Sequence, residues 1–103
     1  SEELLSTLNT IVSHPLLAPY YSSDVEVYNE KEIMTSSGKI IIPDRLVIFN
    51  DLTAVVIDYK TGDPYDKYEA QLANYSEIIE EMGYKVAKKI LVYINASLQV
   101  KVC

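Results

Sequence analysis

Residues 53–62 read TAVVIDYKTG. The apolar and largely β-branched start of this stretch predicts a buried β-strand over residues 53–60. Alternate side chains of a strand share a face, so Asp58 and Lys60 project together while Ile57 and Tyr59 project the other way. Unpaired buried charge costs a large free energy, so a charged pair at the end of an apolar strand needs a reason. The stretch predicts a functional site; the alternative is an exposed ion pair at a strand end.

A second carboxylate, Asp44, precedes Asp58 by fourteen residues and follows a proline that interrupts the preceding strand. A hairpin turning at residues 50–51 would bring Asp44 alongside Asp58. Two carboxylates at close range repel each other unless a cation lies between them, and hard oxygen ligands of this kind suit Mg²⁺ or Mn²⁺. Lys60 would then orient an attacking water and stabilise developing charge. The alternative for Asp44 is an ordinary turn aspartate after a proline.

The helix after this strand has clear start and stop signals. Asp63 can cap it, Pro64 fits the first helical position, and Gly83 supplies the stop. Gln71 and Tyr75 lie one helical turn apart, on one face. An apolar stripe with the helical period comprises Tyr68, Leu72, Tyr75, Ile79 and Met82.

The remaining elements complete one small domain. A helix is expected over residues 1–13, ending near His14 because the following proline disfavours helical geometry there. Its apolar stripe comprises Leu4, Leu5, Leu8, Ile11 and Val12. Extended segments are expected at residues 25–33, 89–95 and 98–102, and one further strand over 39–42 and 45–49 is interrupted at Pro43. The order of a helix, three strands, a helix and two strands predicts a mixed α/β (α+β) domain with a sheet flanked by helices.

Composition narrows the class of protein. The 103 residues suffice for a single domain, no apolar run approaches the roughly 20 residues that span a bilayer, and no signal segment opens the chain. The one cysteine, Cys103, cannot form an intrachain disulfide, which suits a reducing compartment. We therefore expect a cytoplasmic protein without membrane contact. The start at Ser1 and the abrupt end after a strand-like segment predict a fragment of a longer protein.

The formal net charge of −6 argues against a simple, autonomous nucleic-acid binder. Such domains usually carry a basic surface, because neutralising phosphates supplies most of their affinity. An acidic domain can still act on DNA if metal ions mask its carboxylates and neighbouring domains hold the strand.

Three short segments, taken in order, resemble a known family. They are PDR at residues 43–45, DYKTG at 58–62 and QLANY at 71–75. Together they resemble the PD-(D/E)xK nucleases, and specifically the RecB and AddAB branch. The resemblance covers about residues 38–75 and implies a restriction-endonuclease-like core, in which a central mixed sheet is flanked by helices.

The resemblance implies roles for individual residues. Asp44 and Asp58 would be the carboxylates that bind Mg²⁺ or Mn²⁺, with the backbone carbonyl of Tyr59 as a further ligand. Lys60 would be the catalytic lysine. His14 matches the upstream histidine that RecB-type nucleases use as an additional metal ligand. Its alternative is a helix-terminal histidine favoured by the helix dipole.

Three further residues are candidates for contact with the substrate. Gln71 would contact the substrate backbone or hold Lys60 and a metal-bound water in place. Tyr75 is a substrate-binding candidate, although its place in the apolar stripe favours a core role. Arg45 is interpreted as either a salt-bridging residue or a ligand of a substrate phosphate.

These expectations combine into a divalent-metal-dependent DNA nuclease. The chain would be the C-terminal exonuclease domain of a RecB/AddAB-type helicase–nuclease in DNA repair and recombination. Its partners would be DNA and a helicase domain in the same polypeptide or in another subunit. One alternative is a non-catalytic DNA-holding or protein-docking module of the same fold. Another is a stand-alone phage or CRISPR-type exonuclease, although the adaptation nucleases of CRISPR systems often carry cysteines for an iron–sulfur cluster.

Overall fold

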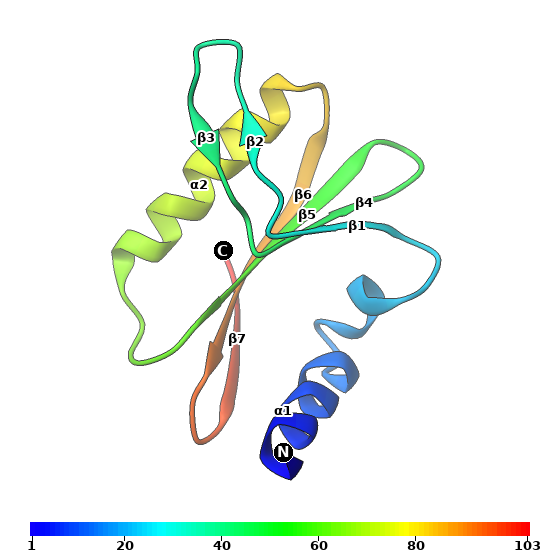
Figure 1. The fold of residues 1–103 in the computed structure, drawn as a ribbon, viewed down its shortest axis with the longest axis vertical. Helices are drawn as coiled ribbons and strands as arrows, with labels where there is room; N and C mark the ends of the chain where they lie inside the picture. Colours follow the sequence, from blue (N-terminus) through cyan, green and yellow to red (C-terminus); the bar gives the residue numbers. More distant parts are fainter.

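A computed structural model describes residues 1–103 (Figure 1). Two α-helices and a short 3₁₀-helix accompany a five-stranded mixed sheet and a separate two-stranded hairpin. In chain order the elements are α1 (Glu2–Ser13), η1 (Ala18–Tyr21), β1 (Glu26–Asn29), β2 (Ile33–Met34), β3 (Ile40–Ile41), β4 (Arg45–Ile48), β5 (Thr53–Lys60), α2 (Asp66–Glu81), β6 (Lys85–Ile94) and β7 (Leu98–Val102). Neither α-helix has the length and apolar character needed to cross a lipid bilayer.

The main sheet has the strand order β1-β4-β5-β6-β7. Only β5 and β6 are parallel, and helix α2 connects them, as a parallel pair requires. The other neighbours are antiparallel. The predicted mixed α/β class is confirmed, and β5 has the predicted bounds. Strand β6 starts at Lys85 rather than at residue 89, because its polar first half pairs with the beginning of β5.

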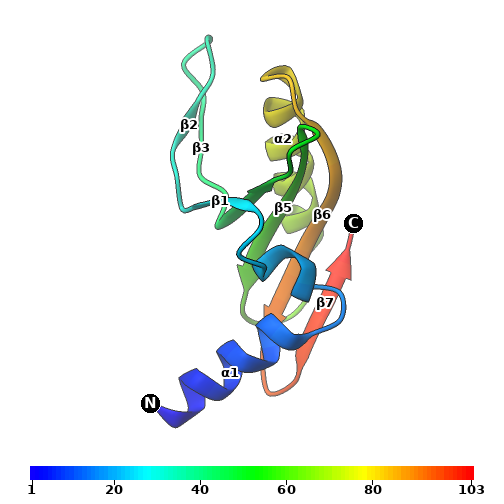
Figure 2. The ribbon, with the colours of Figure 1, turned by 90° about the vertical axis from the view of Figure 1, so that its right-hand side faces the viewer.

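The expected extended segment at residues 25–33 is broken in two. Glu30 has a positive φ of 49°, which turns the chain out of β1. The chain then forms the β2–β3 hairpin, which stands apart from the main sheet (Figure 2). Ile33 and Ile41 of this hairpin belong to the core cluster that includes Ile78 and Ile79 of α2. The hairpin is therefore attached to the domain by apolar packing.

The central sheet is buried on both faces, and the helices lie on opposite sides of it (Figure 1). Along β5, Ala54 and Val56 pack on the α2 side. Val55 and Ile57 pack on the other side, against residues of α1 and η1. Burial of both faces explains why β5 reads as a continuous apolar run instead of an alternating one.

Helix α1 has the predicted bounds but not the predicted burial. The side chain of Ser1 caps it by accepting a hydrogen bond from the amide of Leu4 (3.2 Å), and His14 follows its last residue. Only Ile11 of its apolar stripe is buried; Leu4, Leu5, Leu8 and Val12 are exposed. The reason is that the N-terminal part of α1 projects away from the sheet (Figure 2).

Helix α2 begins later than its sequence signals suggest. Tyr65 occupies the N-cap position with φ −142°, which is extended backbone, so the prediction of Asp63 as the cap is wrong. The C-terminal end agrees with prediction, because Met82 ends the helix and Gly83 follows it with φ +103°. Leu72 and Ile79 of the predicted stripe are buried, whereas Met82 is exposed.

Replacing Gly83 by alanine is expected to lower the free energy of unfolding by about 1–2 kcal/mol, because an L-residue resists a left-handed backbone. An added Cβ would meet no atom within 4 Å, so the cost is conformational and not steric. Urea denaturation measures it. Gly83→Asn is the matched control and should cost less, because asparagine tolerates this region better. Equal losses for both variants would contradict the conformational explanation.

Candidate active site

The C-terminal end of β5 carries the charged pair that its sequence predicts. Asp58 and Lys60 continue the face defined by Ala54 and Val56, which is the α2 side of the sheet. Asp58 is only 3% exposed. Tyr59 points to the opposite side, where its hydroxyl group forms a hydrogen bond with that of Tyr21. The predicted alternation is confirmed.

Asp44 and Asp58 are held together by two reciprocal hydrogen bonds. The backbone amide of Asp44 donates to Asp58 Oδ1 (2.9 Å), and the backbone amide of Tyr59 donates to Asp44 Oδ2 (2.9 Å). The antiparallel pairing of β4 with β5 makes this possible, because it places Arg45 opposite Ile57 and Asp44 just beyond that pair. The hairpin thus brings together the two carboxylates, as the sequence predicts.

Lys60 is held in place from three directions. Its Nζ donates a hydrogen bond to Gln71 Oε1 (3.0 Å) and lies 3.7 Å from Asp58 Oδ2. It also lies 4.6 Å from the centre of the Tyr68 ring, within range of a cation–π interaction. Gln71 therefore holds Lys60, one of its two predicted roles. The apolar stripe predicts only a core role for Tyr68, although its position three residues before Gln71 places both on one helical face.

Burial and charge both act on the paired carboxylates. Burial raises the pKa of Asp58, and the nearby Asp44 carboxylate raises it further, against the opposing effects of the Asp44 amide and Lys60. Burial also raises the pKa of Tyr75, with contributions from Asp58 and Asp44. Tyr75 therefore lies near the site while packing against the core cluster beneath it.

The two paired carboxylates are oxygen donors of the kind that hard divalent cations prefer. One oxygen of each carboxylate accepts a backbone hydrogen bond, which fixes Asp44 and Asp58 in orientation. The second oxygen of Asp58 lies 3.7 Å from Lys60 Nζ. Mg²⁺ commonly binds through one or two protein carboxylates and keeps several of its waters. The close approach of two carboxylates, one of them buried, is electrostatically unfavourable without such a cation.

The structure does not bring His14 into this donor set. No group of three or more His, Cys, Asp or Glu side chains is arranged to hold a metal ion. His14 ends α1, and its Nδ1 accepts a hydrogen bond from the backbone amide of Leu16 (3.1 Å). This arrangement matches the alternative interpretation of His14 as a helix-terminal residue.

Arg45 lies on the opposite face of the sheet from Lys60, so the structure does not support its predicted contact with a substrate phosphate. Its guanidinium group donates to the carbonyl oxygen of Tyr20 (2.9 and 3.3 Å) and to Asn29 Oδ1 (3.2 Å). It also lies 4.1 Å from the centre of the Tyr21 ring. Arg45 forms no salt bridge, and its contacts join η1 and β1 to β4.

The loop after Lys60 is held to the turn between β6 and β7 by the side chain of Asn95. The amide of Gly62 donates to Asn95 Oδ1 (2.9 Å), and Asn95 Nδ2 donates to the carbonyl oxygen of Gly62 (2.9 Å). Gly62 has φ +83°, which favours glycine at this turn. No sequence pattern points to Asn95, because a contact between residues 33 positions apart leaves no local signal.

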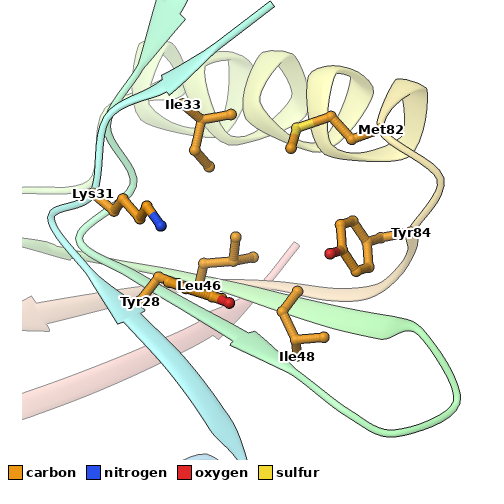
Figure 3. Close-up of a pocket in the computed structure, with 7 residues that line it drawn as sticks. All are labelled: Tyr28, Lys31, Ile33, Leu46, Ile48, Met82 and Tyr84. Atoms are coloured by element: carbon orange, nitrogen blue, oxygen red, sulfur yellow. The ribbon is translucent and has the colours of Figure 1, made fainter.

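A hollow of about 210 Å³ on the α2 side lies away from these residues (Figure 3). Ile48 in its wall pairs with Ala54, at the beginning of β5, whereas Lys60 ends that strand. Its one charged lining residue is Lys31, and it contains no carboxylate. The lining residues are Tyr28, Lys31, Ile33, Leu46, Ile48, Met82 and Tyr84. This hollow therefore lacks the paired carboxylates that the end of β5 carries.

No model of a known protein family matches the sequence, and no curated protein matches it. Among solved structures, the crystal structure of SSO0001 is similar, with a TM-score of 0.57 and 18% sequence identity. The similarity covers 98% of this chain and 58% of that chain, so the present chain spans a little over half of the SSO0001 chain. At this level of identity the similarity shows a shared fold.

Proposed function

We propose that this chain is the core of a divalent-metal-dependent DNA nuclease of the PD-(D/E)xK type, with a restriction-endonuclease-like fold. The observation that supports it best is the convergence of Asp44 and Asp58 with Lys60 on one face of the sheet. These residues are also the ones on which the family resemblance depends. We further propose that the chain is the cytoplasmic C-terminal nuclease domain of a RecB/AddAB-type helicase–nuclease.

Each residue of the site has a defined task in this proposal. Carboxylate oxygens of Asp44 and Asp58, with the carbonyl of Tyr59, would hold Mg²⁺ or Mn²⁺. When bound, such an ion polarises the scissile phosphate and lowers the pKa of an attacking water. Lys60 would donate a hydrogen bond to that water or to a phosphate oxygen, and so stabilise charge that develops in the transition state. Gln71 keeps the Lys60 ammonium group in position through their 3.0 Å hydrogen bond.

A second candidate function is a non-catalytic DNA-holding or protein-docking module of the same fold, and the net charge of −6 favours the protein-docking form. A domain of this charge has little long-range attraction for DNA. The nuclease proposal therefore assigns most of the affinity for the strand to neighbouring domains. The two candidates differ in one measurable property, which is cleavage.

The test is cleavage of a labelled single DNA strand in Mn²⁺. Wild type should cleave, EDTA should stop the reaction, and Lys60→Ala should lower the rate about 100-fold because a stabilising donor is lost. Lys85→Ala is the matched control and should leave the rate unchanged, since Lys85 is exposed at the opposite end of the β5–β6 pair.

Cleavage that persists in EDTA, or equal rates for the two lysine variants, would overturn the proposal. Absence of cleavage by folded wild type would favour a non-catalytic module, which holds DNA if the chain binds the strand and docks protein if it does not. Circular dichroism of each variant separates a loss of chemistry from a loss of fold.

A further inference from the structure

A second hollow lies beside Lys60, against the first turns of α2. Its volume is about 450 Å³. A water molecule takes up about 30 Å³ in the liquid, so this hollow has room for much more than one water or ion. The lining residues are Lys60, Lys67, Tyr68, Ala70 and Gln71. It shares Lys60 with the proposed active site and adds Lys67, which the site does not otherwise use.

The helical period explains how α2 forms one wall of this hollow. Lys67 and Gln71 are four residues apart, and Tyr68 and Gln71 are three apart, so all three side chains lie on one helical face. Tyr68 packs against the core, because the centre of its ring lies 6.4 Å from that of the buried Tyr93. The wall is therefore built on a packed helix and not on a loop.

The polar groups of the hollow suit an anion. The chain has 15 acidic residues against nine lysines and arginines, yet both charged residues that line this surface are lysines. Lys60 is paired with Asp58 (3.7 Å), whereas Lys67 forms no salt bridge and supplies the free positive charge. Gln71 Oε1 already accepts a hydrogen bond from Lys60, which leaves the amide nitrogen of Gln71 as a donor. Lys67 is a donor only, and the Tyr68 hydroxyl can donate. The groups that remain for a ligand are thus hydrogen-bond donors.

We infer that this hollow is the subsite for the phosphodiester group next to the scissile phosphate, and that Lys67 is a substrate-binding residue. The assignment to the neighbouring phosphate rests on the proposed function, which places the scissile phosphate at Asp58 and Lys60. A strand that reaches Lys60 has its next phosphate one nucleotide away, and the hollow is continuous with Lys60. Lys67 supplies the charge for that phosphate, while Tyr68 and Gln71 supply neutral donors.

Binding of a fluorescein-labelled single-stranded DNA 10-mer, measured by anisotropy in EDTA at low salt, tests this inference. Lys67→Gln should weaken binding about three- to tenfold and should reduce the slope of log K against log salt by about 0.7, the value for one phosphate contact on a single strand. Lys85→Gln is the matched control, because it removes the same charge from an exposed site at the other end of β5 and β6. It should change neither quantity.

The inference is overturned if wild type does not bind the 10-mer, or if Lys67→Gln and Lys85→Gln behave alike in affinity and salt slope. This assay needs no catalysis, so its outcome is independent of the cleavage test. Lys67-dependent binding without Mn²⁺-dependent cleavage would overturn the proposed nuclease and retain the anion subsite. Cleavage that depends on Lys60 but not on Lys67 would retain the nuclease and overturn the subsite.

Discussion

Replacing Asp58 by asparagine is expected to abolish Mn²⁺-dependent cleavage and, at the same time, to stabilise the metal-free protein. Loss of one of two metal-binding carboxylates should lower the rate by about 1,000-fold or more. The metal-free fold should become more stable because Asp58 is buried beside Asp44, and both burial and the Asp44 carboxylate raise the pKa of Asp58. Asparagine keeps an oxygen to accept the 2.9 Å hydrogen bond from the Asp44 amide, and it removes the buried charge.

A gain of about 1 kcal/mol would raise the Tm by about 4–8 °C in a domain of this size. Thermal unfolding in EDTA at pH 7 measures it. Asp51→Asn is the matched control with the opposite sign, because hydrogen bonds from the side chain and backbone of Thr53 lower the pKa of Asp51. That variant should lose a little stability and keep full cleavage. A fall in Tm for Asp58→Asn would show that the buried Asp58 charge beside Asp44 does not destabilise the fold.

Replacing Leu72 by alanine is expected to cost about 2–5 kcal/mol of unfolding free energy. Leu72 is fully buried in the α2-side cluster, directly after Gln71. A cavity there removes contacts between α2 and the sheet that the surroundings can only partly restore. Small domains have about 5–15 kcal/mol of stability in total, so this variant should be close to unfolding at 37 °C.

Urea denaturation of Leu72→Ala and Leu4→Ala compares a buried and an exposed leucine on the two helices. Leu4 is 58% exposed, so its removal should change stability by less than about 0.5 kcal/mol. A loss below about 1 kcal/mol for Leu72→Ala would contradict the packing of α2 described above. A large loss for Leu4→Ala would mean that the exposed face of α1 is covered in solution.

The parts of the site that could be predicted from the sequence are those with short-range causes. Strand alternation alone places Asp58 and Lys60 on one face. A hairpin turn between Asp44 and Asp58 brings the two carboxylates together through ordinary antiparallel pairing. Helical spacing then carries Gln71 to Lys60, where the structure shows their hydrogen bond.

The features that the sequence did not predict depend on the direction of the chain after an interruption of regular secondary structure. Pro43 interrupts the strand, so the alternation of side chains cannot be followed across it. The sequence therefore does not show that Arg45 points to the face opposite Lys60. The positive φ of Glu30 separates β1 from the β2–β3 hairpin, and no residue type at that position announces it. The apolar stripe of α1 correctly predicts a helix, but periodicity does not show how many residues of the stripe are buried against the sheet.

The side chain of Asn95 imitates a peptide group, since its oxygen accepts from Gly62 and its nitrogen donates to Gly62. The β5–β6 pairing is therefore extended beyond its last residue pair by two more hydrogen bonds, which a side chain makes in place of the main chain. Chemical ageing of asparagine by deamidation replaces that nitrogen with an oxygen that cannot donate. A carboxylate oxygen would then face the Gly62 carbonyl, and the segment that follows Lys60 would keep only one of these two hydrogen bonds, the one from the Gly62 amide.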